Sequence, residues 1–169
     1  HGLLRRQRQM CIRDSHGMVG LINMPTARIY DEGSFAFSAY GGSPDQKITL
    51  ASSPFDWLEA SVFYTNIKDK PYCEADDYFC SQDYKDKGFN LKIKIKEEDR
   101  LPAIAIGIND FGGTGLYGSE YIVGSYGIEN MDFHFGLGWG AYNGTKDFRN
   151  PFTILDLSLI HISEPTRQI

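Results

Sequence analysis

Three lysines at alternate positions, Lys92, Lys94 and Lys96, are the side chains with the most evident chemical potential in this 169-residue chain. Successive side chains of a β-strand point to opposite faces, so this spacing places all three ammonium groups on one face. Three ammonium groups facing one aqueous space would attract anions, and many exported polysaccharides are acidic. Alternatively, the lysines pair with carboxylates and only hold the structure together. The carboxylates considered for this pairing are Glu59, Glu120 and Asp132.

The lysines lie in the first strand of a predicted β-hairpin over residues 84–115. In this strand, large apolar residues at positions 89, 91, 93 and 95 alternate with Asn90 and the lysines. In the second strand, Ile104, Ile106 and Ile108 alternate with small residues. Pro102 is expected at the first residue of that strand, where a missing backbone donor costs least. The hairpin therefore has one apolar face and one polar or small face.

Similar strand patterns occur along the rest of the chain, without helical periodicity of convincing length. Further strands are predicted at residues 34–39, 47–52, 56–66, 117–126 and 131–141. The predicted fold class is all-β, an antiparallel meander of about seven strands. Alternating segments of about ten residues, joined by short and long connections with Tyr and Trp near the strand ends, are typical of a transmembrane barrel. Because about seven strands are too few to close such a barrel, we expect a partial outer-membrane β-barrel whose parent contributes more strands.

The polar face of these strands would line the lumen of the barrel. His134 lies there between glycines and is expected to be a hydrogen-bonded lumen residue rather than a metal ligand. The expected lumen-lining residues are Asn90, Lys92, Lys94, Lys96, Glu120, Asp132 and His134. The sequence predicts neither a metal site nor a cofactor.

Residues 17–30 precede the regular strands and carry Arg28 as their only charge. They could fold into the barrel as a plug, with Arg28 meeting Asp110 or Glu120. The plug would then pack against small residues of the later strands. These are Ala103, Ala105, Gly107, Gly118 and Gly124.

A catalytic function rests on one weak pattern. Asp110 and Glu120 could be imagined as the acid and base of a glycosidase, which places two carboxyl groups around a sugar bond. The sequence does not fix their separation. The glycines at 113–118 match G-x-G-x-x-G, but a dinucleotide site needs a helix after the glycines, and a strand pattern follows here. The chain is therefore not expected to be an enzyme.

Both ends of the chain break the composition of its middle. Residues 5–15 and 157–167 resemble translations of an adapter used in short-read sequencing libraries. We therefore treat residues 1–15 and 157–169 as non-native tails, and residues 16–156 as a barrel domain from a longer protein. The tails hold five of the 17 basic and two of the 22 acidic residues, so the domain has a net charge of about −8. Nucleic acid is not an expected partner, because phosphate contacts need clustered Lys and Arg.

Two cysteines of this domain, Cys73 and Cys80, lie in an acidic loop. Their closeness fits a small disulfide in an oxidising compartment, which favours a periplasmic or surface location over the cytosol. Two unpaired thiols are the alternative, and a structural zinc site would need two more ligands at suitable spacing. The acidic residues could also collect a calcium ion, although their spacing is not that of an EF-hand.

A resemblance to a known family runs through five segments, in order and spacing. They are GLINMPTAR, FDWLEASVFYTNI, YKDKGFNLKIKI, LPAIAIGINDFGGTGLYGSEYIV and FGLGWG, within residues 16–142. These segments resemble the N-terminal part of the YjbH-like exopolysaccharide-associated outer-membrane barrel proteins. The resemblance implies an outer-membrane barrel of Gram-negative bacteria, acting in production or export of an exopolysaccharide or capsule, with no catalytic residues to carry over. The implied partners are outer-membrane lipid, anionic polysaccharide and other exopolysaccharide-export proteins.

A soluble periplasmic β-sandwich that binds carbohydrate is the rival interpretation. Its binding residues would be Tyr117, Tyr121, Trp139 and Tyr142. The two interpretations differ in what the apolar residues at positions 89–95 face. They face lipid in the barrel and a second sheet in the sandwich.

Overall fold

The computed structural model describes residues 12–42, 45–71, 82–142 and 150–152. Its regular elements are strands, which confirms the all-β prediction. The first two form a small hairpin, β1 (Gly20–Leu21) and β2 (Met24–Pro25). The others are β3 (Ser34–Gly41), β4 (Asp45–Phe55), β5 (Leu58–Pro71), β6 (Asp83–Lys96), β7 (Ala103–Phe111), β8 (Ser119–Ile128) and β9 (Met131–Gly140).

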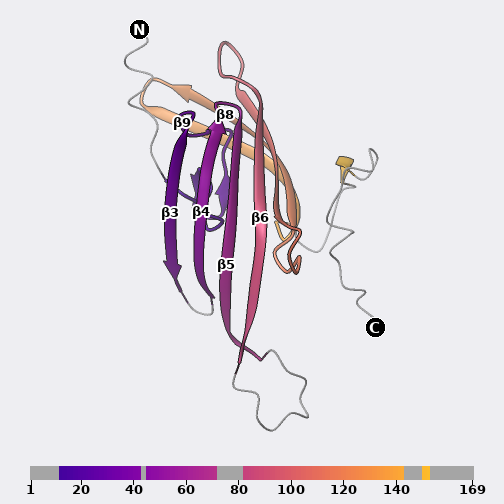
Figure 1. The fold of residues 1–169 in the computed structure, drawn as a ribbon. Helices are drawn as coiled ribbons and strands as arrows, with labels where there is room; N and C mark the ends of the chain where they lie inside the picture. The colour runs from indigo at the N-terminus through magenta and orange to yellow at the C-terminus, as the bar shows by residue number, and fades with distance from the viewer. Residues whose placement is uncertain (1–11, 43–44, 72–81, 143–149, 153–169) are drawn as a thin grey trace.

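Strands β3 to β9 form one seven-stranded sheet in sequential order, and every neighbouring pair is antiparallel. The predicted meander is therefore confirmed. The sheet curls, so that β8 and β9 pass behind β3 and β4 in Figure 1, with the N-terminal segment between them. Within the described ranges β3 and β9 are edge strands that do not pair with each other, so the sheet is not closed.

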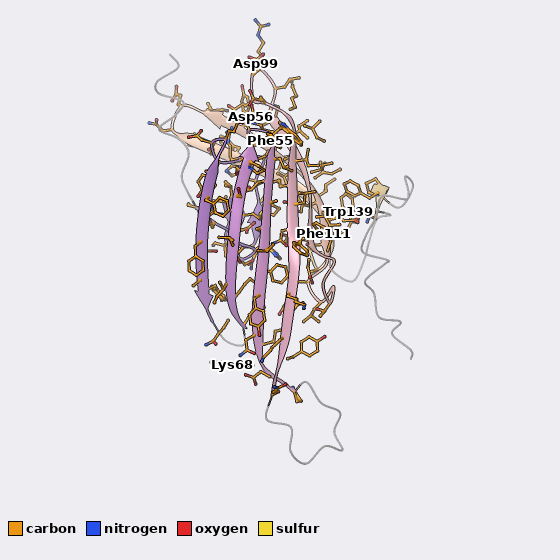
Figure 2. All side chains as sticks on the ribbon, in the orientation of Figure 1. Phe55, Asp56, Lys68, Asp99, Phe111 and Trp139 are labelled. Atoms are coloured by element: carbon orange, nitrogen blue, oxygen red, sulfur yellow. The ribbon has the colours of Figure 1, made fainter. Side chains whose placement is uncertain are left out.

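The connections differ between the two ends of the sheet. Short turns at residues 56–57, 97–102 and 129–130 join strands at one end, and the other connections lie at the opposite end. Figure 2 places Phe55, Asp56 and Asp99 at the short-turn end and Lys68 at the other. The turn predicted at residues 53–55 is wrong by about two residues. β4 continues to Phe55 through an irregularity in its pairing with β5, which accommodates Pro54 because a bulge needs no donor there.

The two faces of the sheet have opposite polarity and opposite exposure. Phe89 and Ile95 are 47% and 60% exposed, whereas Asn90 and Lys92, on the other side of the same strand, are 1% and 0% exposed. We call these sides the apolar face and the polar face. The apolar face carries Phe35, Phe37, Ile48, Leu50, Val62, Tyr64, Phe89, Ile104, Phe133, Phe135 and Leu137, all exposed. The polar face is covered by the N-terminal segment, residues 12–30.

Phe63 and Tyr121 are large aromatic side chains that point to the polar face. Phe63 lies opposite Gly88 on β6, and Tyr121 lies opposite Gly107 on β7. A Cβ on either glycine would collide with the facing ring. Each ring therefore fills the space that a glycine on the neighbouring strand leaves. Tyr121 joins the one small apolar cluster found among the described residues, which consists of Ala27, Ala103, Ala105, Tyr121 and Val123.

Candidate functional site

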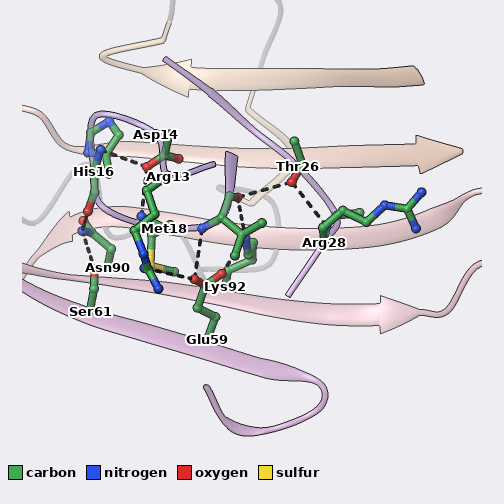
Figure 3. A network of polar contacts seen from close by, with 12 residues as sticks. Arg13, Asp14, His16, Met18, Thr26, Arg28, Glu59, Ser61, Asn90 and Lys92 are labelled. Atoms are coloured by element: carbon green, nitrogen blue, oxygen red, sulfur yellow. Dashed lines mark hydrogen bonds and ion pairs between the residues drawn. The ribbon is translucent and has the colours of Figure 1, made fainter. Parts of the chain in front are cut away.

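An ion pair on the polar face holds the peptide backbone of the N-terminal segment. Glu59 and Lys92 are register partners on β5 and β6, and both side chains are fully buried. Lys92 Nζ lies 2.7 Å from Glu59 Oε2. Val19 N–H donates to Glu59 Oε1 at 3.0 Å, and Lys92 Nζ donates to the carbonyl oxygen of Val19 at 2.8 Å (Figure 3). The pair thus satisfies both polar groups of one residue.

Asn90 makes a second contact with the segment's backbone. Its Nδ2 donates to the carbonyl oxygen of His16 at 3.2 Å and to Ser61 Oγ at 2.8 Å (Figure 3). Its Oδ1 accepts from the Asp110 N–H at 3.0 Å. Since the amide uses both its donor and its acceptor side, its orientation is fixed and it joins β5, β7 and the segment.

A third backbone contact lies on β8. Ser125 Oγ accepts a hydrogen bond from Ala27 N–H at 2.9 Å and lies 2.8 Å from His134 Nδ1 on β9. His134 and Asp132 lie on the polar face, because they are register partners of Ser125 and Gly127. The sheet therefore contacts the segment's backbone from β5, β6 and β8.

Arg28 corrects one expectation about the segment. It was expected to meet Asp110 or Glu120, but it pairs with Glu98 in the β6–β7 turn and with Asp132 at 2.7 Å. All three side chains are partly exposed. The segment does pack against Ala103 and Ala105 through Ala27.

Lys92, Lys94 and Lys96 on β6 do not act as one group. Lys92 is buried against Glu59, as in the pairing alternative, whereas Lys94 Nζ lies 2.7 Å from Glu97 in the adjoining turn. Lys96 is partly buried at the end of the strand. The Lys92 ammonium is therefore closed off from any solvent anion while the segment is in place.

Asp110 and Glu120, the imagined acid and base, lie on opposite faces. Asp110 has a φ of 53° where the β6–β7 register shifts, and its N–H bonds to Asn90 on the polar face. Glu120 was predicted to line the lumen, and this prediction is wrong. It is the register partner of Ile108 and Trp139, so it lies on the apolar face, where Asn150 Nδ2 donates to its Oε2 at 2.6 Å. The neighbouring residue Tyr121 points to the polar face, where its ring occupies the space above Gly107. Glu120 therefore points to the other face, because successive side chains of a strand alternate.

A second buried polar cluster, which was not predicted from the sequence, lies toward the end of the sheet opposite to the turns at residues 56–57, 97–102 and 129–130. Lys47 is 8% exposed, and its Nζ lies 4.9 Å and 5.2 Å from the ring centroids of Phe63 and Tyr117. Tyr117 donates its hydroxyl hydrogen to Asp45 Oδ2 at 2.8 Å. Burial, with Asp45 beside it, raises the pKa of Tyr117. The alternation of Lys47, Thr49 and Ser53 with apolar residues was the available signal.

His16 is buried where the segment meets this cluster. Burial, with the Lys47 ammonium nearby, lowers its pKa to about 3. The imidazole is therefore neutral at physiological pH.

The rival carbohydrate site is not assembled. Tyr121 lies on the polar face and Trp139 on the apolar face, where its ring contacts Phe152 edge-on. Tyr142 packs edge-on against Tyr121. Tyr117 is engaged with Asp45. These aromatic rings do not form one binding surface.

Several expectations concern metals, membrane helices and cysteines. Among residues 12–42, 45–71, 82–142 and 150–152, no group of three or more His, Cys, Asp or Glu is arranged to hold a metal ion. The same ranges contain no helix of the length and hydropathy needed to cross a bilayer. Cys73 and Cys80 lie outside the described residues, so their disulfide stays a prediction.

Comparison with known proteins gives a family match and a relative. The YjbH family, described as "Exopolysaccharide biosynthesis protein YbjH", matches residues 13–163. The chain is 37% identical over 136 residues to a protein of Escherichia coli (strain K12) named "Uncharacterized lipoprotein YjbH". That match covers 80% of this chain and 20% of the relative, so the chain spans about a fifth of the relative's length. No solved structure matches the chain.

Proposed function

Because the chain belongs to the YjbH exopolysaccharide biosynthesis family, we propose that it is part of an outer-membrane β-barrel that serves exopolysaccharide production or export without catalysis. The sheet then spans the outer membrane of a Gram-negative bacterium. Its apolar face contacts lipid, and its polar face forms part of the barrel interior.

The observation that carries this proposal is the inverted polarity of the sheet. Large apolar side chains are exposed along the apolar face, while Glu59, Asn90 and Lys92 are buried behind it. No second sheet covers the apolar face in the part of the chain that the structure describes. Exposed apolar rows with polar groups inside are the arrangement of a transmembrane barrel wall, because its solvent on one side is hydrocarbon.

The connections and aromatic residues at the ends of the sheet indicate which end faces the periplasm. The two shortest of these connections, residues 56–57 and 129–130, lie at the same end of the sheet, and short turns mark the periplasmic end of bacterial barrels. Phe55 and Trp57 lie there with parallel rings whose centroids are 5.4 Å apart, and both are about half exposed. Aromatic side chains at strand ends suit the headgroup region. The relative's name, a lipoprotein, also supports membrane association.

We further propose outer-membrane lipid, an anionic polysaccharide and other export proteins as partners. Lys92 contributes little to anion attraction while it is buried against Glu59, and Lys94 is paired with Glu97, so Lys96 is the remaining lysine of these three for that role. The opposite facing of Asp110 and Glu120 supports a non-catalytic function, since a glycosidase needs both carboxyls on one sugar bond.

A membrane-insertion experiment tests this proposal. Leu50 lies mid-strand on the apolar face and Leu101 lies in the β6–β7 turn, and both are exposed. In the complete protein folded into lipid vesicles, Leu50→Arg should cost about 2–4 kcal/mol of folding free energy. Leu101→Arg, outside the hydrocarbon, should cost far less. Equal costs, or a complete protein that is soluble without detergent, would refute the membrane assignment.

A further inference from the structure

The contacts between the sheet and the N-terminal segment are mostly contacts to backbone. Glu59 and Lys92 bind the N–H and C=O of Val19, Asn90 binds the C=O of His16, and Ser125 binds the N–H of Ala27. A face that binds backbone groups holds an extended chain without depending on most of its side chains.

The polar face carries more hydrogen-bonding capacity than the segment uses. Several buried atoms of the face find no hydrogen-bond partner among the described residues, and water can reach them when the face is uncovered. They are Ser53 Oγ, Thr65 Oγ1, Asp86 Oδ2, Asn109 Oδ1, Asp110 Oδ1 and Tyr121 Oη. The interface between segment and sheet is therefore polar and incompletely paired.

A permanently covered face gains little from such groups. A buried ion pair is often no more stabilising than apolar residues of similar size, because both charges must leave water. The same ion pair and hydroxyl groups are well solvated when water covers the face. The composition of the polar face thus suits two states, one covered by the segment and one hydrated.

The segment joins the sheet through an exposed turn. Asp31, Glu32 and Gly33 separate it from β3. Gly33 has a φ of 76° and open space around its Cβ position. The Gly33 N–H donates to the carbonyl oxygen of Ser53 on β4 at 2.8 Å, so a rotation at Asp31 or Glu32, before this bond, moves the segment without disturbing strand pairing.

We propose that residues 16–30 of the N-terminal segment detach from the polar face while the seven-stranded sheet stays folded. The Glu59–Lys92 ion pair, which binds the backbone of Val19 and which we call the clamp, holds the segment in place. In the released state, water occupies the face and the Lys92 ammonium becomes accessible. This inference concerns a conformational change and does not depend on the membrane assignment.

A cysteine-accessibility experiment tests the proposal in the full chain, folded in detergent micelles. Ala105, fully buried beside Ala27, becomes the reporter as Ala105→Cys, with Cys11, Cys73 and Cys80 replaced by serine. Glu59→Met with Lys92→Met removes the clamp without leaving a lone buried charge. Maleimide labelling should become about thirtyfold faster, a shift of about 2 kcal/mol in release. Amide exchange in β5 and β6 should stay slow.

The matched control uses the other ion pair of β6. Lys94→Met with Glu97→Met removes a pair of equal length, 2.7 Å, for which the described residues of the segment supply no hydrogen bond or ion pair, so labelling should not change. Labelling that is insensitive to the clamp would overturn the proposal. So would labelling that rises only together with amide exchange of β5 and β6, since that result means unfolding of the sheet.

A second variant acts from the segment and leaves the sheet unchanged. Gly17 has a φ of 78°, and a Cβ there collides with Thr49 on β4. Gly17→Ala should therefore also speed labelling of Ala105→Cys. Gly112→Ala, in the connection between β7 and β8, carries similar backbone strain at a φ of 68° but meets Phe89 only at an ordinary contact distance of 3.6 Å, so it should have little effect. If the two variants show equal labelling rates, the fit of the segment against β4 does not control its release, and the proposal is contradicted.

Discussion

Removing Lys92 alone should destabilise the protein far more than removing both members of its ion pair. Lys92→Met leaves the Glu59 carboxylate fully buried without its ammonium partner. Breaking a buried pair by removing one partner costs about 3–5 kcal/mol. Arg13, in the tail treated as non-native, lies with its Nη1 3.9 Å from Glu59 Oε1 and supplies partial compensation in this chain, so we expect the lower end here, about 3 kcal/mol.

The double replacement has a smaller expected cost. Glu59→Met with Lys92→Met leaves no uncompensated charge, and its main loss is the two hydrogen bonds to Val19. At about 1 kcal/mol per hydrogen bond, the loss is about 2 kcal/mol. The double variant should therefore be more stable than the Lys92→Met single variant.

Urea unfolding of the chain in detergent micelles measures these differences. The exposed pair of Lys94 with Glu97 is the reference, because such pairs contribute only about 0.2–1 kcal/mol. If Lys92→Met lowers the free energy of unfolding no more than Lys94→Met does, the Glu59–Lys92 pair is hydrated in solution. The reasoning about a buried ion pair is then wrong.

Three further predictions concern other contacts of the polar face. Gly107→Val forces a side chain into the Tyr121 ring and should cost about 1–3 kcal/mol or more, measured as a lower urea midpoint; an unchanged midpoint would contradict this packing. His16 has a folded pKa of about 3 against an ordinary 6.5, so its stabilising contribution is present above pH 6.5 and is lost as the pH falls toward 3. The wild type should lose stability relative to His16→Gln by about 1.4 kcal/mol per pH unit in that window, and parallel pH profiles would refute the burial of His16. Ser125→Ala leaves the Ala27 N–H without its acceptor and should speed hydrogen exchange of that amide; unchanged exchange would mean that the bond is not formed in solution.

The facing of β6 and β9 could be predicted from sequence, because alternation is a local property. Large apolar residues at every second position between 89 and 95 and between 131 and 139 can lie on one face only if the backbone is extended. The meander followed from the same patterns and the short connections. Membership of β8 in the sheet was also predictable, but not which of its residues faces which side.

The facing of β8 depended on a neighbouring strand. Tyr121 points to the polar face because Gly107, its register partner on β7, leaves room for the ring, and Glu120 is thereby placed on the apolar face. Phe63 and Gly88 form the same arrangement between β5 and β6. Register between strands is a property of two segments at once, and no single segment reveals it.

The sequence by itself determined that the chain makes strands with one apolar and one polar side, since side-chain direction alternates along any extended backbone. Only the tertiary structure decided that the polar side is the buried one, that Lys92 pairs with Glu59 across Val19, and that Arg28 reaches Glu98 and Asp132. The physical reason is that these partners are far apart in the chain. Their contacts depend on where the N-terminal segment lies on a curved sheet, which the alternation of side chains leaves undetermined.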